Sequence, residues 1–294
     1  MKQKPAKYQV VDLPSARQDT PNFLDMFWWR HIMYGLLEVD VTIIRQFIAE
    51  QKKLTGEALS FTGYLAFCLA RAVDEDKSVQ AYLKGRKKLT LFDDVDVGIT
   101  VERQMDGKRA PAGHVIRSAN HKTYMEIHQE IRDVQKKPAP QSKGMPPWFR
   151  FFLLLPWPVP KLFIALMTAG RRQDPDRFMV SIGGTVGITA VGMFGHKGGW
   201  GITPPVHSLG LIVGGIARKP AVVDDRIEAR EMLSLTVAFD HDVVDGAPAA
   251  RFVQRLVEMI EGGHGLSAIE QADYIQVGDI TKLTKEELSH LREN

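Results

Sequence analysis

Four short apolar runs in the second half of the chain constrain its fold most. Turn residues (Gly, Pro and Asp) separate these runs, which are FMVSI, VGITAVG, SLGLIVGGI and LSLTVAFD. Runs of this length and composition, bounded by turn residues, are typical of strands. The segments LLEVDVT and DVDVGITVE in the first half predict two more strands, and KKLTLF is expected to be the neighbour of the second.

Helical periodicity appears between these strands. Apolar residues recur at helical spacing from Ile43 to a stop at Gly56, and we expect further helices at about 60–74 and 122–136 and after Gly246. A capping box from Thr284 to Glu287 predicts a last short helix. Helices combined with a largely antiparallel or mixed sheet predict an α/β (α+β) two-layer sandwich.

Composition limits the class of protein. A chain of 294 residues with 44% hydrophobic content can bury a full core. A single cysteine, Cys68, excludes a disulfide framework and multi-cysteine metal sites, and it favours a reducing compartment. The basic N-terminus has no apolar stretch behind it, so we expect no secretory signal and a cytoplasmic protein. A net charge of +3 is too small to indicate nucleic acid as a partner.

Residues 138–177 combine basic charge with apolar side chains. The segment Trp148–Thr168 has the sequence WFRFFLLLPWPVPKLFIALMT, long enough to span a bilayer. Its prolines remove backbone donors, and Arg150 and Lys161 would cost about 2.5–3.5 kcal/mol each near mid-membrane. We therefore predict two short helices joined at PWPVP. They would pack on the parent domain, or turn an apolar face to a partner subunit, an acyl-chain pocket or an anionic membrane surface.

The motif that points to chemistry follows the last predicted strand. LSLTVAFD runs directly into His241 and then, through DVVDG, into a helix. A histidine at the end of a buried strand is held by rigid backbone. Asp245, four residues later, lies in the tight connection, where it can fix the local turn.

Several motifs resemble one known family. The run FDHDVVDGAPAARFVQRLVEMI resembles the His-x-x-x-Asp-Gly signature of the chloramphenicol acetyltransferase-like superfamily, most closely the catalytic core of dihydrolipoyl acyltransferases from 2-oxo-acid dehydrogenase complexes. GTVGITAVGMFG, residues 184–195, is similar to that core's Gly-Thr-Phe-Thr-Ile-Ser-Asn-Leu-Gly-Met-Phe-Gly element. TPPVHSLGLIVGGIARKPAVVDDRIEAREML then follows as the next strand, turn and return. The likeness covers roughly residues 23–262, interrupted by the basic apolar insert.

The resemblance implies a trimeric enzyme with a mixed sheet that transfers an acyl group between a thioester and a thiol, usually with coenzyme A. It implies His241 as general base, and it places Thr189 where the family has a serine hydroxyl that binds the oxyanion. It divides the chain into an N-terminal arm (1–22), an acyltransferase catalytic domain (23–270) and a C-terminal tail with a short helix (271–294).

The resemblance also implies supporting roles. The family's aspartate at Asp245, followed by Gly246, braces the turn through an arginine, for which Arg17 and Arg30 are the candidates. A backbone carbonyl orients the imidazole. Asp242 departs from the family, which commonly has arginine after the histidine, and this puts the usual acyl acceptor in doubt.

Alternatives remain open at this point. The family's full-length members carry lipoyl domains ahead of the core, so we expect a stand-alone form that uses a lipoyl-bearing protein in trans or another acceptor. A non-catalytic trimeric scaffold for a 2-oxo-acid dehydrogenase assembly is one alternative, and a membrane-associated acyltransferase with a lipid-like acceptor is another. No metal is expected, because the remaining histidines lack metal-ligand spacing; these include His31, His196, His207 and His264.

Overall fold

The computed structural model describes residues 12, 20–25, 30–84, 87–105, 108–136, parts of 151–162, 180, 183–190, 198–204 and 206–266. A six-stranded sheet in the order β1-β8-β7-β6-β4-β5 forms its centre. The strands are β1 Ile32–Asp40, β4 Val97–Met105, β5 Lys108–Ile116, β6 Val186–Ala190, β7 Leu209–Val223 and β8 Arg226–Asp240. The pairs β4/β6 and β6/β7 are parallel and the other neighbours are antiparallel. The predicted mixed sheet is therefore confirmed.

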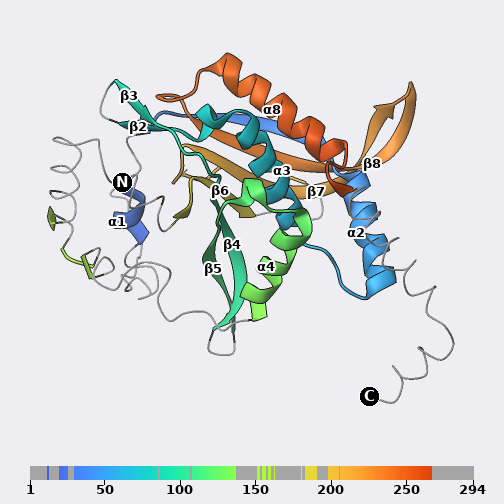
Figure 1. Ribbon diagram of the computed structural model, residues 1–294, viewed down its shortest axis with the longest axis horizontal. Coiled ribbons are helices and arrows are strands. Elements are labelled where there is room, and N and C mark those ends of the chain that lie inside the picture. Colours follow the sequence, from blue (N-terminus) through green and yellow to red (C-terminus); the bar gives the residue numbers. More distant parts are fainter. Residues whose placement is uncertain are drawn as a thin grey trace, which may run out of the picture.

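The long helices gather on one side of this sheet (Figure 1). They are α2 Thr42–Thr55, α3 Phe61–Glu75, α4 Tyr124–Lys136 and α8 Gly246–Glu261, and short elements add α1 Thr20–Asp25, η2 Lys77–Gln80 and η3 Ala119–His121. Local sequence sets two of the helix ends. Ser60 accepts a hydrogen bond from the Gly63 N–H at the start of α3, and Gly56 ends α2 with a left-handed φ of 78°.

Alternate residues along β4 and β6 are buried and contribute to the core between the sheet and the helices. On β4, Val97, Ile99 and Val101 are buried in this core, and Val186 and Ile188 continue the pattern on β6. The residues between them, such as Gly98 and Thr100, face the other side of the sheet, because successive strand residues point to opposite faces. The second face is therefore the one that the long helices leave uncovered.

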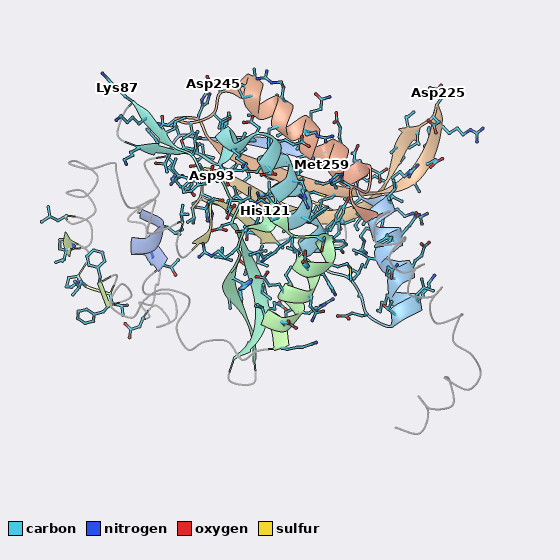
Figure 2. All side chains as sticks on the ribbon, in the orientation of Figure 1. Lys87, Asp93, His121, Asp225, Asp245 and Met259 are labelled. Carbon is cyan, nitrogen blue, oxygen red and sulfur yellow. The ribbon has the colours of Figure 1, made fainter. Side chains whose placement is uncertain are left out.

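Strands β7 and β8 form a hairpin that extends beyond the body of the sheet. Asp225 marks its tip in Figure 2, far from Asp245 at the start of α8. Asp224 and Asp225 both have positive φ, 48° and 60°, which matches the type I′ turns that tight hairpins prefer. Local patterns found only SLGLIVGGI and LSLTVAFD within these strands, whereas the strand, turn and return implied by the resemblance include the hairpin.

One predicted strand pairing and one predicted strand are wrong, and one strand was missed. KKLTLF is not the neighbour of β4, because β3 (Lys88–Thr90) pairs with β2 (Tyr82–Lys84) in a separate small sheet. Val180, inside FMVSI, is helical, and its carbonyl accepts a hydrogen bond from the Gly184 N–H. Strand β5 was overlooked because Pro111 and Gly113 weaken its pattern, which an edge strand tolerates.

Several predictions fall outside the described residues. These concern the N-terminal arm with Arg17, most of the insert 138–177, His196, and the tail with its capping box at Thr284. In the part of the chain that the structure does describe, no helix combines the length and the hydropathy needed to cross a membrane.

Candidate active site

His241 lies in the turn between β8 and α8. Its backbone N–H donates to the His31 carbonyl, with an N···O distance of 2.7 Å, which fastens the end of β8 to the start of β1. The Asp240 carbonyl accepts the N–H groups of Val243 and Val244 and so closes the turn. The imidazole is 52% exposed, so a substrate can reach it.

Asp245 is an exposed neighbour of this imidazole. Its carboxylate is 87% exposed and lies 3.8 Å from Nδ1 of His241. It occupies the N-cap position of α8, although its side chain makes no capping hydrogen bond with the described residues. A carboxylate so open to water can contribute only weakly to the rigidity of the turn.

The arginine brace connects to a different aspartate. The guanidinium of Arg30 is 3.5 Å from the carboxylate of Asp240, the residue before His241, and both side chains are almost fully buried. Arg30 also donates to the Ser208 hydroxyl and lies over the Tyr82 ring. The structure thus places Arg30, one of the two arginines considered as the partner of Asp245, beside Asp240.

Asp240 links this ion pair to the turn. Its carboxylate accepts the backbone N–H of Asp242 at 3.1 Å. Burial raises the pKa of Asp240, and the Arg30 charge and this hydrogen bond oppose that rise. The buried pair therefore holds the backbone that presents His241.

Asp242 faces a second histidine. Nδ1 of His31 is 3.1 Å from both carboxylate oxygens of Asp242, and the His31 side chain is 73% exposed. Sequence reasoning gave His31 no role, and 211 positions separate the two residues, so no local spacing could have paired them. The residue that departs from the family's arginine thus forms an acid–imidazole pair beside His241.

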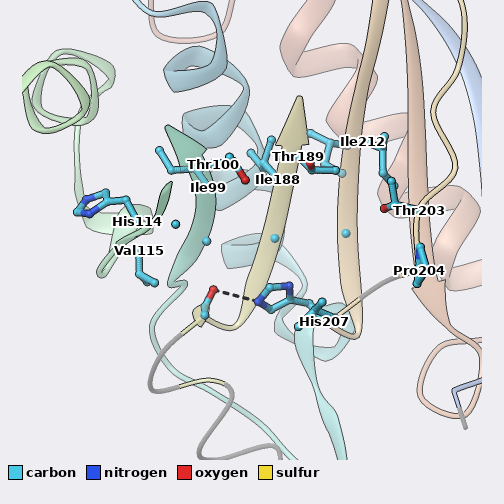
Figure 3. Close-up of a pocket in the computed structure, with 17 residues that line it drawn as sticks. Ile99, Thr100, His114, Val115, Ile188, Thr189, Thr203, Pro204, His207 and Ile212 are labelled. Atoms are coloured by element: carbon cyan, nitrogen blue, oxygen red, sulfur yellow. Dashed lines mark hydrogen bonds between the residues drawn. The ribbon is translucent and has the colours of Figure 1, made fainter. Parts of the chain in front are cut away.

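Thr189 stands on β6, in a cavity of about 420 Å³ on the second face of the sheet. Strands β4, β5, β6 and β7 form the floor, and Thr203, Pro204, Val206 and His207 form one wall (Figure 3). Thr100 contributes another hydroxyl to the lining.

Four strand glycines line this cavity. Gly98, Gly187 and Gly210 are directly in register on β4, β6 and β7, and Gly113 lines the same cavity from β5. The Gly183 backbone fills the space over Gly98 and the His207 ring fills the space over Gly187, whereas Gly210 and Gly113 leave space that a side chain would occupy. Thr189 lies two residues along the strand from Gly187, on the same face.

The cavity also contains a histidine to which the sequence gave no function. His207 donates from Nε2 to the Gly183 carbonyl at 2.9 Å, shown as the dashed line in Figure 3. Enclosure of the ring, aided by the Arg30 charge, lowers the pKa of His207 to about 4. The ring is therefore neutral near pH 7.

A single chain does not bring Thr189 and His241 together. Thr189 pairs with Ile212, which pairs with Thr236, five residues before His241 on the chain. Two inter-strand steps of about 4.8 Å and five residues of about 3.3 Å each place the two Cα atoms roughly 19 Å apart. A single thioester cannot contact both side chains across that distance.

The described residues hold no group of three or more His, Cys, Asp or Glu side chains that could bind a metal ion. Cys68 is buried in α3, and burial raises the pKa of its thiol to about 12.

The fold is that of acyltransferase cores. Azotobacter vinelandii dihydrolipoamide acetyltransferase superposes with a TM-score of 0.63 at 17% identity, over 90% of this chain and 99% of that one. The cubic core of a pyruvate dehydrogenase multienzyme complex gives a TM-score of 0.62 at 18% identity, over 90% and 99% of the two chains. These likenesses define the class of fold.

The sequence defines the family. The model of the 2-oxoacid dehydrogenases acyltransferase (catalytic domain) matches residues 29–143 and 177–267, well over half of the chain, so this protein belongs to that family. Residues 144–176 fall between the two matched segments. The dihydrolipoyllysine-residue acetyltransferase component of the pyruvate dehydrogenase complex of Rickettsia conorii is 25% identical over 218 residues, 74% of this chain and 43% of the relative. The chain thus spans less than half of that relative's length.

Proposed function

We propose that this protein is a coenzyme A-dependent acyltransferase whose active site forms between protomers of a homotrimer. The observation that supports this is the separation of two accessible groups, Thr189 in the cavity and His241 in an exposed turn roughly 19 Å away. A neighbouring protomer that docks its turn over the cavity would supply the missing base.

The proposed reaction needs one base and one hydrogen-bond donor. Neutral His241 takes the proton of the attacking thiol, and the thiolate adds to the thioester carbonyl. The Thr189 hydroxyl donates to the oxygen that becomes negative in the tetrahedral intermediate. Collapse breaks the original carbon–sulfur bond, and the imidazolium returns the proton to the leaving thiolate.

The acyl acceptor in this reaction is a thiol. A dihydrolipoyl group on another protein is the acceptor that the names of the relatives suggest. A different thiol is the alternative, because Asp242 stands where the family commonly has arginine. Coenzyme A is a substrate in this proposal. Assembly of trimers into a larger core, as in the cubic core named above, is part of the proposal.

Mixing two inactive variants tests the shared site. His241→Ala and Thr189→Val should each be inactive alone, because each removes one half of every site. In randomly mixed trimers about one quarter of the interfaces would combine an intact His241 with an intact Thr189, so about one quarter of wild-type thioester consumption should return. Failure of mixed trimers to regain activity would place the site within one chain or elsewhere.

The same assay separates the enzyme from a scaffold. Thioester consumption by the wild type at the rate of His241→Ala would contradict catalysis and leave only an organising role. The size of the native particle, measured by native mass spectrometry, tests the trimer independently, and a monomer would contradict the shared site.

A further inference from the structure

His207 occupies the cavity in a way that a purely structural histidine does not require. Its Nε2–H is used by the Gly183 carbonyl, so Nδ1 carries the lone pair. Among the described residues Nδ1 has no hydrogen-bond partner. A neutral ring with a free acceptor in a substrate cavity can accept a hydrogen bond from a ligand.

The sequence around the ring is shaped to admit it. An ideal Cβ on Gly187 would lie 2.4 Å from Nδ1 of His207, so only glycine leaves space for the ring above β6. Gly210, the next member of the glycine row, has room above it, because its ideal Cβ would meet only the Ala238 Cβ at 3.9 Å. Open space therefore lies beside the ring, over Gly210.

Distances along β6 relate this acceptor to the oxyanion donor. Thr189 and Gly187 are two residues apart on one face, about 6.7 Å. In a pantetheine thioester five bonds separate the thioester oxygen from the first amide nitrogen, a reach of about 6 Å at the extension of a polypeptide backbone. A thioester whose carbonyl oxygen is bound by the Thr189 hydroxyl would therefore have its first amide near His207.

We propose that His207 is a specificity residue that accepts a hydrogen bond from the first amide N–H of a pantetheine arm that runs from Thr189 past the ring toward Gly210. The inference rests on the proposed function and adds the feature of the substrate that is recognised. A pKa of about 4 keeps the ring an acceptor throughout the neutral range. A dihydrolipoyl thiol has no amide at this spacing, so His207 would distinguish the two thiols.

Two substitutions separate recognition from structure. Glutamine at position 207 can place its amide nitrogen where Nε2 donates to Gly183, and it has no acceptor at Nδ1. Asparagine reverses this, because its amide lies near Nδ1 and does not reach Gly183. His207→Gln should keep the fold and lose recognition, whereas His207→Asn should keep much of the recognition and lose stability.

Calorimetric binding of pantetheine to the full chain is the test. His207→Gln should weaken pantetheine binding about 2- to 12-fold, the loss of one neutral hydrogen bond, with an unchanged melting temperature. His207→Asn should bind within about 2-fold of wild type and melt lower. Dihydrolipoamide should bind all three proteins alike.

Filling the space over Gly210 provides a second variant. Gly210→Ala adds one methyl group where the structure has space, so the protein should fold and bind pantetheine more weakly. Gly35→Ala is the matched control, because Gly35 is also a strand glycine with room for a Cβ and lies outside the cavity lining. Equal pantetheine affinity of Gly210→Ala and Gly35→Ala would count against this path of the arm.

The remaining outcomes are also decisive. Absence of pantetheine binding to wild type, or equal affinity of wild type and His207→Gln, would overturn the inference. Turnover that depends on His241 is measured separately, so the proposed function can stand when this inference fails. Tighter binding of coenzyme A than of pantetheine would identify the nucleotide-bearing substrate as the source of the arm, and equal affinity would identify an arm carried on a protein.

Discussion

The turn after β8 and the cavity over β6 present their functional groups by opposite means. The turn exposes His241 on a backbone held from beneath by the buried Arg30–Asp240 pair. The cavity presents Thr189 on a strand face where Gly210 and Gly113 leave space that side chains would fill. The turn depends on a buried polar network and the cavity on open space over glycines. Substitutions should therefore have different effects in the two regions.

The largest expected effect is on catalysis at the turn. His241→Ala removes the proposed base and should lower kcat by about 10²–10⁴-fold. The side chain is half exposed, so the melting temperature should stay within a few degrees of wild type. Steady-state thioester turnover and thermal unfolding measure the two quantities, and undiminished kcat would refute the assignment.

The Arg30–Asp240 pair beneath the turn should contribute to the free energy of unfolding. Asp240→Ala leaves the Arg30 charge buried without this carboxylate and should cost about 3–5 kcal/mol in the free energy of unfolding. Asp245→Ala should cost less than about 1 kcal/mol, because its carboxylate is exposed. Urea unfolding compares the two, and a larger loss for Asp245→Ala would restore it as the structural brace.

In the cavity, the hydroxyl group of Thr189 should contribute more to kcat than its methyl group. Thr189→Val keeps the shape and removes the donor, so kcat should fall by about 10²–10³-fold. Thr189→Ser keeps the donor and should stay within about tenfold of wild type. Equal activity of the valine and serine variants would show that Thr189 does not bind the oxyanion.

The smallest effect concerns pH and His207. Its pKa of about 4 lies below that of an unfolded histidine, near 6.5, so the unfolded chain gains a proton first as the pH falls. The free energy of unfolding should therefore decrease between about pH 6.5 and 4, by at most about 3 kcal/mol because the ring is partly exposed. Urea unfolding at several pH values should show a smaller decrease for His207→Gln; His128, whose pKa is also lowered by burial, affects both proteins alike.

Predictions from sequence succeeded where the signal was local. The helix that ends at Gly56, the helix capped by Ser60 and the strand leading into His241 follow from spacing and capping residues within a few positions. They failed for KKLTLF, because which strands become neighbours depends on how distant segments pack. They also missed β5, whose proline and glycine suit only an edge strand.

The sequence by itself determined the family, the mixed sheet, and the identities of His241 and Thr189 as candidate groups. These follow from motifs and periodicity, which are patterns of residues close together in the chain. Only the tertiary structure decided that Arg30 meets Asp240, that Asp242 meets His31 and that His207 joins Thr189 in a cavity. These pairings join residues far apart in the chain, and strand order and register, which no local pattern encodes, fix which of them meet.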